Sequence, residues 1–378
     1  MARILVVAEN YAFGPIGKLL TITKHLKQSG HTLIFIGDGT AYQLGKKEDF
    51  DEIHQINTDS NTFREQVIYI FNDVDCVLSS MDRSSVLLAQ ELHISVICID
   101  ILFWWWYKIP EYLYNVDLYI KQNSIIDSRN KDKYWSKFRN IVEVGPIIDL
   151  SILKDVEPKN QVIVAYGGME AEGIYKVGSD TFYPYTMTEL LVKTVDFGRF
   201  DTVIFTGNEK IIDDLKSKYE TSKFKFMMFN HERFIRELAS SAIAIMVPGL
   251  ETPLEAFSYN VPTIFLPPSN SSQYVQLDEF RKYHVAYASI HFRDYLKRSY
   301  FAGRNLHKIM QEFLVQLNHF ENTEWILDDV SKRINEYLSN KKKLAKQVEQ
   351  QKRFISSLGS DGLENALKII NQFIEEIT

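Results

Sequence analysis

The segment from residue 246 to residue 273 contains residue types that can bind a nucleotide. A buried apolar run is followed by a turn containing Gly249, and a helix is expected near Thr252, with Pro253 in its first turn. Such a helix start presents free backbone N–H groups and the positive end of the helix dipole, which suit a diphosphate. Glu255 lies one turn further along, where its carboxylate can accept hydrogen bonds from the hydroxyl groups of a ribose.

The same residues also have a purely structural interpretation. The order Thr252-Pro253-Leu254-Glu255 satisfies a capping box, in which Thr252 is the N-cap and Glu255 reaches back to its backbone N–H. The spacing alone favours this interpretation, because capping boxes are common at helix starts. Both interpretations place the start of a helix here, and they differ only in whether a ligand is bound.

Two adjacent glycines, Gly167 and Gly168, follow a strand expected over residues 162–165. Because glycine has no side chain, such a pair at a strand end lets a ligand approach the backbone closely. A tight turn without a ligand explains the pair equally well. The two glycines are therefore a second, less specific candidate for a binding loop.

The segment from residue 246 to residue 273 resembles the donor-nucleotide motif of the GT-B glycosyltransferases. In that superfamily a strand, a glycine-containing turn, a threonine, a Glu-Ala pair, a Val-Pro pair and a terminal glutamine occur in this order. The matching positions in this chain are Gly249, Thr252, Glu255-Ala256, Val261-Pro262 and Gln273. The chain departs from the motif at Val247, where many members have histidine, and at Pro248, which replaces the first glycine of a pair.

The resemblance implies a nucleotide-diphosphate sugar as co-substrate, with a UDP-sugar as the first expectation, and a small-molecule acceptor as the second partner. It implies no other cofactor. The residues implied for donor binding are, in chain order, Gly167, Gly168, Gly249, Thr252, Glu255, Ser272 and Gln273. The first two would flank the donor, the next two would contact the diphosphate, Glu255 would bind the ribose, and the last two would lie near the donor sugar.

The N-terminal part of the chain resembles the same superfamily, with one important departure. Gly14 matches the first glycine of the superfamily pattern, and Gly30 with His31 matches its second Gly-His pair. The first histidine, which is the usual general base for the acceptor, is replaced by Pro15. Histidine suits this role because its pKa lies near the working pH, whereas proline has no group that accepts a proton. Another residue must serve as base, or the acceptor needs none, or the chain is not a catalyst.

Three carboxylates are the candidates for a replacement base. Glu9, Asp82 and Asp100 each come at, or just after, the end of an expected strand. The carboxyl ends of parallel strands form the edge of a sheet at which ligands bind. Each of the three residues is also explained as a turn or capping residue.

A run of aromatic residues from 103 to 107 follows Asp100. Five consecutive aromatic side chains cannot all face one core in either a helix or a strand, so some must face a cavity, an interface or solvent. Trp104, Trp105 and Trp106 offer flat, amphipathic surfaces that suit a sugar or an aromatic acceptor. Together with Gly14 they are the expected acceptor-binding residues. The alternative is a hydrophobic patch that packs on a neighbouring helix or on a second subunit of a homodimer.

The elements that must position these residues form two α/β series. Short apolar strands alternate with helical patterns, first before residue 150 and again after residue 161, and a polar linker is expected over residues 154–161. This alternation predicts an α/β protein with two Rossmann-like parallel-sheet domains, a ligand cleft between them, and site residues at strand ends. The expected domains are residues 1–153 and 162–360, and the resemblance implies that residues 361–378 form a helix packing on the N-terminal domain.

The composition limits the remaining possibilities. The chain has 378 residues, and its 43 Lys and Arg against 49 Asp and Glu give a net charge of −6, which offers no footprint for nucleic acid. Cys76 and Cys98 are its two cysteines, so a disulfide framework or a CxxC zinc site is excluded and a cytoplasmic location is expected. The longest apolar-aromatic stretch, residues 94–107, is too short to span a bilayer, and no integral membrane association is expected.

The predicted function is transfer of a sugar from the nucleotide-diphosphate donor to the acceptor. Inversion at the sugar is implied by the resemblance to inverting families. The two Asp-x-Asp pairs, at residues 49–51 and 73–75, are interpreted as solvated loop residues, so no metal is expected. The alternatives are a GT-B relative such as a nucleotide-sugar epimerase or hydrolase, and, because of Pro15, a non-catalytic GT-B partner protein.

Overall fold

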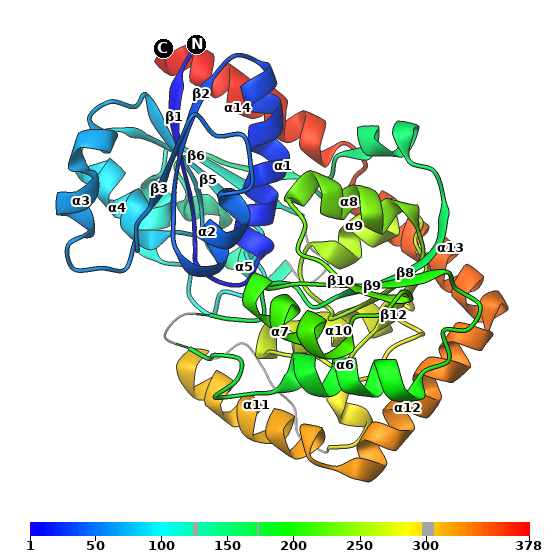
Figure 1. The fold of residues 1–378 in the computed structure, drawn as a ribbon. Helices are drawn as coiled ribbons and strands as arrows, with labels where there is room; N and C mark the ends of the chain where they lie inside the picture. The colour runs from blue at the N-terminus through cyan, green and yellow to red at the C-terminus, as the bar shows by residue number, and fades with distance from the viewer. Residues whose placement is uncertain (124–127, 172–173, 297–305) are drawn as a thin grey trace. The chain divides into compact units, whose positions relative to one another are not determined.

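The protein is described by a computed structural model that covers residues 1–378 except 124–127, 172–173 and 297–305. The chain forms two compact units. The first consists of Met1–Asp149 and Leu358–Thr378, and the second of Leu150–Ser357. Both chain ends therefore belong to the first unit, in strand β1 (Arg3–Ala8) and helix α14 (Gly362–Ile377) (Figure 1).

The first unit is built on a parallel sheet of seven strands in the order β3-β2-β1-β4-β5-β6-β7. The strands after β1 are β2 (Thr32–Gly37), β3 (Glu52–Gln55), β4 (Cys76–Ser80), β5 (Ser95–Asp100), β6 (Leu118–Gln122) and β7 (Ile141–Val144). Most of them are short apolar runs buried on both faces, as expected for a parallel sheet between helices. The edge strand β3 has the mostly polar sequence Glu-Ile-His-Gln and is largely accessible.

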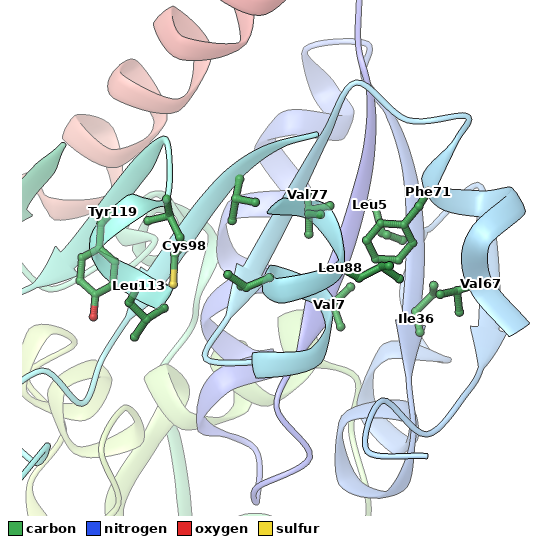
Figure 2. Close-up of a cluster of buried hydrophobic side chains, with 14 of the residues drawn as sticks. Leu5, Val7, Ile36, Val67, Phe71, Val77, Leu88, Cys98, Leu113 and Tyr119 are labelled. Atoms are coloured by element: carbon green, nitrogen blue, oxygen red, sulfur yellow. The ribbon is translucent and has the colours of Figure 1, made fainter. Parts of the chain in front are cut away.

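Helices cover both faces of this sheet. They are α1 (Gly14–Gln28), α2 (Gly39–Gly45), α3 (Phe63–Phe71), α4 (Arg83–Glu91), α5 (Ser128–Tyr134) and α14. The core between the sheet and helices α3 and α4 contains Leu5 and Val77 from the strands, with Phe71 and Leu88 from the helices (Figure 2). This buried cluster includes residues of β1, β4 and β5, the strands that precede the candidate base residues.

The C-terminal helix α14 packs on α1 and β7 of the first unit, as the resemblance implied. The turn before it is held by Asn123, whose side-chain amide donates to the carbonyl of Leu358 over 3.1 Å. A Cβ atom added at Gly362 would lie only 2.2 Å from the carbonyl oxygen of Pro146. The helix can therefore approach the chain this closely only because its first residue has no side chain.

The second unit has a parallel sheet of five strands in the order β10-β9-β8-β11-β12. The strands are β8 (Lys159–Ala165), β9 (Thr202–Thr206), β10 (Phe224–Phe226), β11 (Ser241–Met246) and β12 (Thr263–Phe265). The helices are α6 (Tyr183–Thr194), α7 (Glu209–Tyr219), α8 (His231–Ser240), α9 (Thr252–Ser258), α10 (Ser271–Lys282), α11 (Leu306–Glu321), α12 (Glu324–Ser339) and α13 (Lys341–Leu358). The predicted α/β class with two Rossmann-like parallel sheets is confirmed.

The polar segment expected to be a linker is only partly irregular. A 3-10 helix spans Leu150–Asp155, and strand β8 already begins at Lys159. The side-chain amide of Gln161 donates to the carboxylate of Glu237 over 2.9 Å, so a polar residue is accommodated inside the sheet. The boundary between the two units lies at residue 150, before this segment rather than within it.

Helix α13 is held to the second unit by two buried glutamines. The side-chain amide of Gln347 donates to the Thr263 carbonyl over 2.8 Å, and its oxygen accepts from the backbone N–H of Ala288 over 2.7 Å. The side-chain amide of Gln351 donates to the Val285 carbonyl over 2.8 Å. These bonds fix α13 against the start of strand β12 and against the chain that follows α10.

Candidate functional site

The loops after strands β8 and β11 leave open space at the carboxyl edge of the second sheet. These two strands are neighbours, and the backbone N–H of Val247 donates to the Ala165 carbonyl over 3.2 Å. Gly167 follows β8 with a φ of +72°, and Gly249 follows β11. A Cβ atom added at either glycine would have no atom of the described residues within 4 Å. The backbone of both loops is therefore accessible to a ligand.

Asn208 holds the loop that contains the two glycines. Its backbone N–H donates to the Gly167 carbonyl over 3.1 Å, and its side-chain amide donates to the Gly168 carbonyl over 3.2 Å. The same residue is the N-cap of helix α7, where its side-chain oxygen accepts from the N–H of Lys210. One buried asparagine thus joins the ends of β8 and β9 and fixes the glycine loop.

Helix α9 begins at Thr252, but the capping box predicted at its start is wrong. The N-cap is Glu251, whose backbone is already in the helical region at φ −105° and ψ −54°, and no side chain caps the helix. A capping box needs an extended N-cap residue, so the helical backbone of Glu251 excludes that arrangement. Glu255 lies in the first turn of α9 and is buried, at 4% exposed.

A capping arrangement is found instead at the start of helix α10. The side-chain oxygen of Asn270 accepts from the backbone N–H of Gln273 over 3.0 Å and from the Ser272 hydroxyl over 2.8 Å. The side-chain oxygen of Gln273 accepts from the backbone N–H of Ser269 over 2.8 Å. Ser272 and Gln273 thus lie in the first turn of α10, and their side-chain oxygens are engaged at its start.

The structure brings all the predicted donor residues to one edge of one sheet. Gly167 and Gly168 follow β8, the segment from Gly249 to Glu255 follows β11, and Ser272 and Gln273 follow β12. These three strands are consecutive in the sheet. Because parallel strands share their carboxyl edge, residues from three loops are placed on one side of the second unit.

Glu9 and Asp82 lie at the carboxyl edge of the first sheet, after the neighbouring strands β1 and β4. Asp82 is the N-cap of helix α4, and its Oδ1 accepts from the Ser85 N–H over 2.7 Å. The Glu9 carboxylate accepts no hydrogen bond from the described residues. Burial, and then the charges of Asp82 and Asp59, raise the pKa of Glu9 to about 8. Burial also raises the pKa of Asp82.

Asp100, at the end of strand β5, has a fully engaged carboxylate. Its Oδ1 accepts from the Leu102 backbone N–H over 2.5 Å, and its Oδ2 accepts from Trp106 Nε1 over 3.0 Å and from the Tyr119 hydroxyl. The residue is 1% exposed, and burial raises its pKa although these three donors oppose the shift. The geometry is that of a residue which anchors the following loop.

The aromatic run is divided between core and surface. Phe103 and Trp104 are buried, Trp105 and Trp106 are half-buried, and Tyr107 is 43% exposed. The expectation that the five rings cannot all face one core is confirmed. The rings of Trp104 and Trp105 meet edge to face with centroids 5.6 Å apart. Gly14, the first residue of α1, lies close to the start of this loop, because a Cβ atom added there would be 3.4 Å from Cδ1 of Ile101.

Three of the four carboxylates of the two Asp-x-Asp pairs, those of Asp51, Asp73 and Asp75, are engaged within the first unit. Asp51 accepts from the Leu33 N–H over 2.8 Å and pairs with Lys27. The Asp73 carboxylate forms an ion pair of 2.9 Å with the Arg3 side chain. The Asp75 carboxylate accepts from the Arg3 backbone N–H over 2.8 Å. No helix in the part of the chain that the structure describes is both long enough and apolar enough to cross a membrane.

The sequence matches no protein family model and no curated protein. Solved structures do match over nearly the whole chain. UGT2 of Phytolacca americana, complexed with UDP-2-fluoro-glucose and pterostilbene, is 10% identical with a TM-score of 0.53, and the match covers 99% of each chain. The spinosyn forosaminyltransferase SpnP is 11% identical with a TM-score of 0.52, and the match covers 100% of this chain and 99% of the other.

The chain has the GT-B fold. At these identities the likeness establishes the fold, and it supplies no residue roles. Within this GT-B protein the predicted donor residues belong to the second unit, and the predicted base and acceptor residues belong to the first.

Sequence reasoning missed three residues that shape the candidate site of this GT-B protein. Asn208 fixes the glycine loop, Glu251 stands at the start of α9, and Asn270 organises the start of α10. Asn208 and Asn270 each follow a strand and precede a helical pattern, which is the signal of an N-cap and could have identified them. No comparable signal exists for Glu251, because glutamate is not a preferred N-cap residue.

Proposed function

We propose that this GT-B protein is a glycosyltransferase that moves a sugar from a UDP-sugar to a small-molecule acceptor, with inversion and without a metal. The observation that carries the proposal is at the carboxyl edge of the second sheet, where a Cβ atom added at Gly167 or at Gly249 would meet no atom of the described residues within 4 Å. The Phytolacca americana UGT2 structure is a complex with UDP-2-fluoro-glucose and pterostilbene, and the proposal extends both kinds of ligand to this chain.

In the proposed donor site the diphosphate binds along the backbone of Gly167 and Gly249, with Gly168 and Thr252 beside it. Glu255, in the first turn of α9, accepts hydrogen bonds from the ribose hydroxyls. Ser272 and Gln273 face the donor sugar. The Oε1 atom of Gln273 is engaged by Ser269, so its Nε2 group is the donor that we assign to the sugar.

We assign the general base to Glu9 rather than to Asp82 or Asp100. Glu9 has a carboxylate without a hydrogen bond to the described residues, whereas Asp82 caps α4 and Asp100 holds three donors. A pKa of about 8 also suits a base that must accept a proton near neutral pH. This assignment supplies a proton acceptor where Pro15 removes the usual histidine.

The proposed reaction is a single displacement. The acceptor oxygen forms a bond to the anomeric carbon while the bond from that carbon to the diphosphate oxygen breaks, and the electron pair leaves with UDP. Glu9 takes the proton of the acceptor hydroxyl. Trp105 and Trp106, with the buried Trp104 behind them and Gly14 close by, bind the acceptor. Backbone N–H groups of the Gly167-Gly168 loop and of the start of α9 balance the developing charge on the diphosphate, whereas the Gly249 N–H already donates to the Val247 carbonyl over 2.8 Å.

A nucleotide panel tests the donor assignment. UDP, GDP, dTDP and CDP are titrated into the wild-type protein and into Glu255→Ala by calorimetry. Glu324→Ala is the matched control, because Glu324 is an exposed glutamate in the first turn of α12 in the same unit. We expect UDP to bind most tightly, Glu255→Ala to weaken it about tenfold or more, and Glu324→Ala to leave it unchanged. Equal binding by Glu255→Ala and the wild type would remove Glu255 from the site.

Pro15 stands where the usual base histidine is expected, and this favours a second candidate function. In that case the chain is a GT-B protein that binds a nucleotide without transferring a sugar. The two functions differ in turnover and not in binding. Incubation with UDP-glucose and pterostilbene, followed by mass spectrometry of the products, separates them. A glycosylated stilbene with release of UDP supports the transferase, free glucose with UDP indicates hydrolysis, and UDP binding without any product supports the non-catalytic protein.

A further inference from the structure

Asp100 connects strand β5 to the aromatic loop, which we define as residues 101–107. One carboxylate oxygen accepts from the backbone N–H of Leu102, and the other accepts from the indole N–H of Trp106 and from the Tyr119 hydroxyl. Two of these donors belong to the aromatic loop itself, one at its start and one near its end. The carboxylate thus fixes both the backbone and a side chain of the loop.

Asn130, on helix α5, fixes the same loop from a second side. Its side-chain amide donates to the Phe103 carbonyl over 2.6 Å and to the Trp106 carbonyl over 2.8 Å. The ammonium group of Lys121 lies 5.2 Å from the centre of the Phe103 ring, on the strand that pairs with β5. The aromatic loop is therefore held by buried polar groups and not only by apolar packing.

Burying a carboxylate in order to hold a loop has a large free-energy cost. Removing its charge from water costs several kcal/mol, which the surrounding hydrogen bonds only partly offset, and apolar residues of similar volume are often as stabilising. What a buried polar network provides is a single arrangement of the groups around it, because every donor must meet its acceptor. In this loop the arrangement leaves Tyr107 exposed and Trp105 half-buried, with Trp105 braced edge to face by Trp104.

We propose that Asp100 is a positioning residue that holds the aromatic loop so that Trp105 and Tyr107 form a wall for a flat, apolar acceptor ring. This inference rests on the proposed function, because it assigns a substrate class to the acceptor part of that site. Asp100 itself does not touch the acceptor, since its three partners enclose it. Its effect is transmitted through Trp106 and the backbone of Leu102.

The variant Asp100→Asn tests this role with little change in volume. The amide replaces one carboxylate oxygen by an NH₂ group, which must then face either the Leu102 N–H or the donors of Trp106 and Tyr119. The new NH₂ group then faces a donor in place of an acceptor, so the loop loses at least one of its hydrogen bonds to residue 100. Asp117→Asn is the matched control, because the Asp117 carboxylate accepts from the Val96 N–H over 3.0 Å and pairs with Arg139 in the same unit.

Two measurements in the absence of nucleotide decide the proposal. Trp104, Trp105 and Trp106 lie in the loop, so the change in acrylamide quenching of tryptophan fluorescence between a variant and the wild type reports the accessibility of the loop. Quenching by added pterostilbene gives its dissociation constant. We expect Asp100→Asn to increase acrylamide quenching and to weaken pterostilbene binding about tenfold, as a misplaced binding wall would. The control Asp117→Asn should change neither.

The conservative variant Tyr119→Phe removes one donor from Asp100 and should shift both readouts in the same direction by less. Unchanged quenching and affinity in a folded Asp100→Asn protein would overturn the positioning role, and so would an equal effect of Asp117→Asn. Failure of the wild type to bind pterostilbene would overturn the acceptor class. UDP affinity should be unaffected by Asp100→Asn, so failure of UDP to bind the wild type concerns the proposed function alone.

Discussion

Glu9 and Asp82 follow neighbouring strands of one sheet, and the pKa of each carboxyl group is raised. For Glu9, burial is the largest cause, and the charges of Asp82 and Asp59 add to it, so that its pKa reaches about 8. For Asp82, burial raises the pKa against the hydrogen bonds from Ser85 and Thr58. The two groups differ in their partners, because Asp82 accepts hydrogen bonds whereas Glu9 is affected only by burial and by neighbouring charges.

The first prediction concerns the pH dependence of transfer. A base must be ionised to accept a proton, so kcat/KM should rise with pH through an apparent pKa near 8. Glu9→Gln should reduce kcat by about 10² to 10⁴ and remove this dependence. Asp59→Asn, which removes one cause of the shift, should move the profile toward lower pH. A profile that Glu9→Gln leaves unaltered would assign the base elsewhere.

The same residue makes a prediction about folding stability. A carboxyl group whose pKa is raised on folding, here from 4.5 to about 8, contributes stability that is fully present below 4.5 and lost as the pH rises through 8. Glu9→Gln should therefore match the wild type in Tm near pH 4 and exceed it near pH 9. Thermal unfolding at the two pH values measures the difference. A variant less stable than the wild type at pH 9 would show that the Glu9 carboxylate has a partner.

The sequence predicts the strands and helices well where burial of apolar side chains determines them. It predicts them less well where single polar residues determine their bounds. Runs such as residues 4–8 are apolar throughout and could only be buried strands. The edge strand β3 has no such run, because one side of an edge strand is accessible to solvent, and it was not predicted. The charged helical stretch from residue 324 is divided at Asn340, whose side-chain oxygen accepts from the Lys343 N–H.

The sequence predicts which loops carry the candidate site residues, but it does not predict the side-chain partners of those residues. The order of glycines and carboxylates along the chain placed residues on three strand-end loops, because a parallel sheet gathers such loops at one edge. The partners of Asp100 could not be predicted, since Tyr119 and Asn130 reach it or its loop from distant segments. The capping pattern at Thr252 was predicted wrongly because the sequence does not reveal that the backbone of Glu251 is helical.

A third prediction concerns the ion-pair network around Asp294 in the second unit. Burial alone would raise the pKa of Asp294, but Arg281 and then Arg333 lower it to about 2. The stabilisation is present above pH 3.8 and lost as the pH falls through 2. Asp294→Ala should cost about 2–4 kcal/mol of unfolding free energy at pH 7.

Urea unfolding at pH 7 and at the lowest pH at which the protein stays folded measures this effect. The cost of Asp294→Ala should be smaller at the lower pH. Glu349→Gln, which breaks an exposed pair with Lys352, is the control and should cost less than about 1 kcal/mol. A cost that does not depend on pH would mean that Asp294 stabilises the unit by packing rather than by its charge.

A fourth prediction concerns the docking of helix α14 on the first unit. A methyl group at residue 362 would lie 2.2 Å from the carbonyl oxygen of Pro146, and backbone on both sides prevents relief. Gly362→Ala should therefore lower the unfolding free energy by at least about 1–3 kcal/mol. Denaturant unfolding measures the loss. A variant as stable as the wild type would show that α14 shifts without cost.

The most direct test of the proposed donor site is the affinity of UDP for Gly249→Val, measured by calorimetry beside the wild type. The backbone of Gly249 is not in the left-handed region, and a Cβ atom there would meet no described atom within 4 Å. The substitution should leave the Tm unchanged while filling the space assigned to the diphosphate. We predict that the wild type binds UDP and that a fully folded Gly249→Val binds it at least about tenfold more weakly. Equal affinity of the two proteins, or no UDP binding by the wild type, would contradict the proposed donor site.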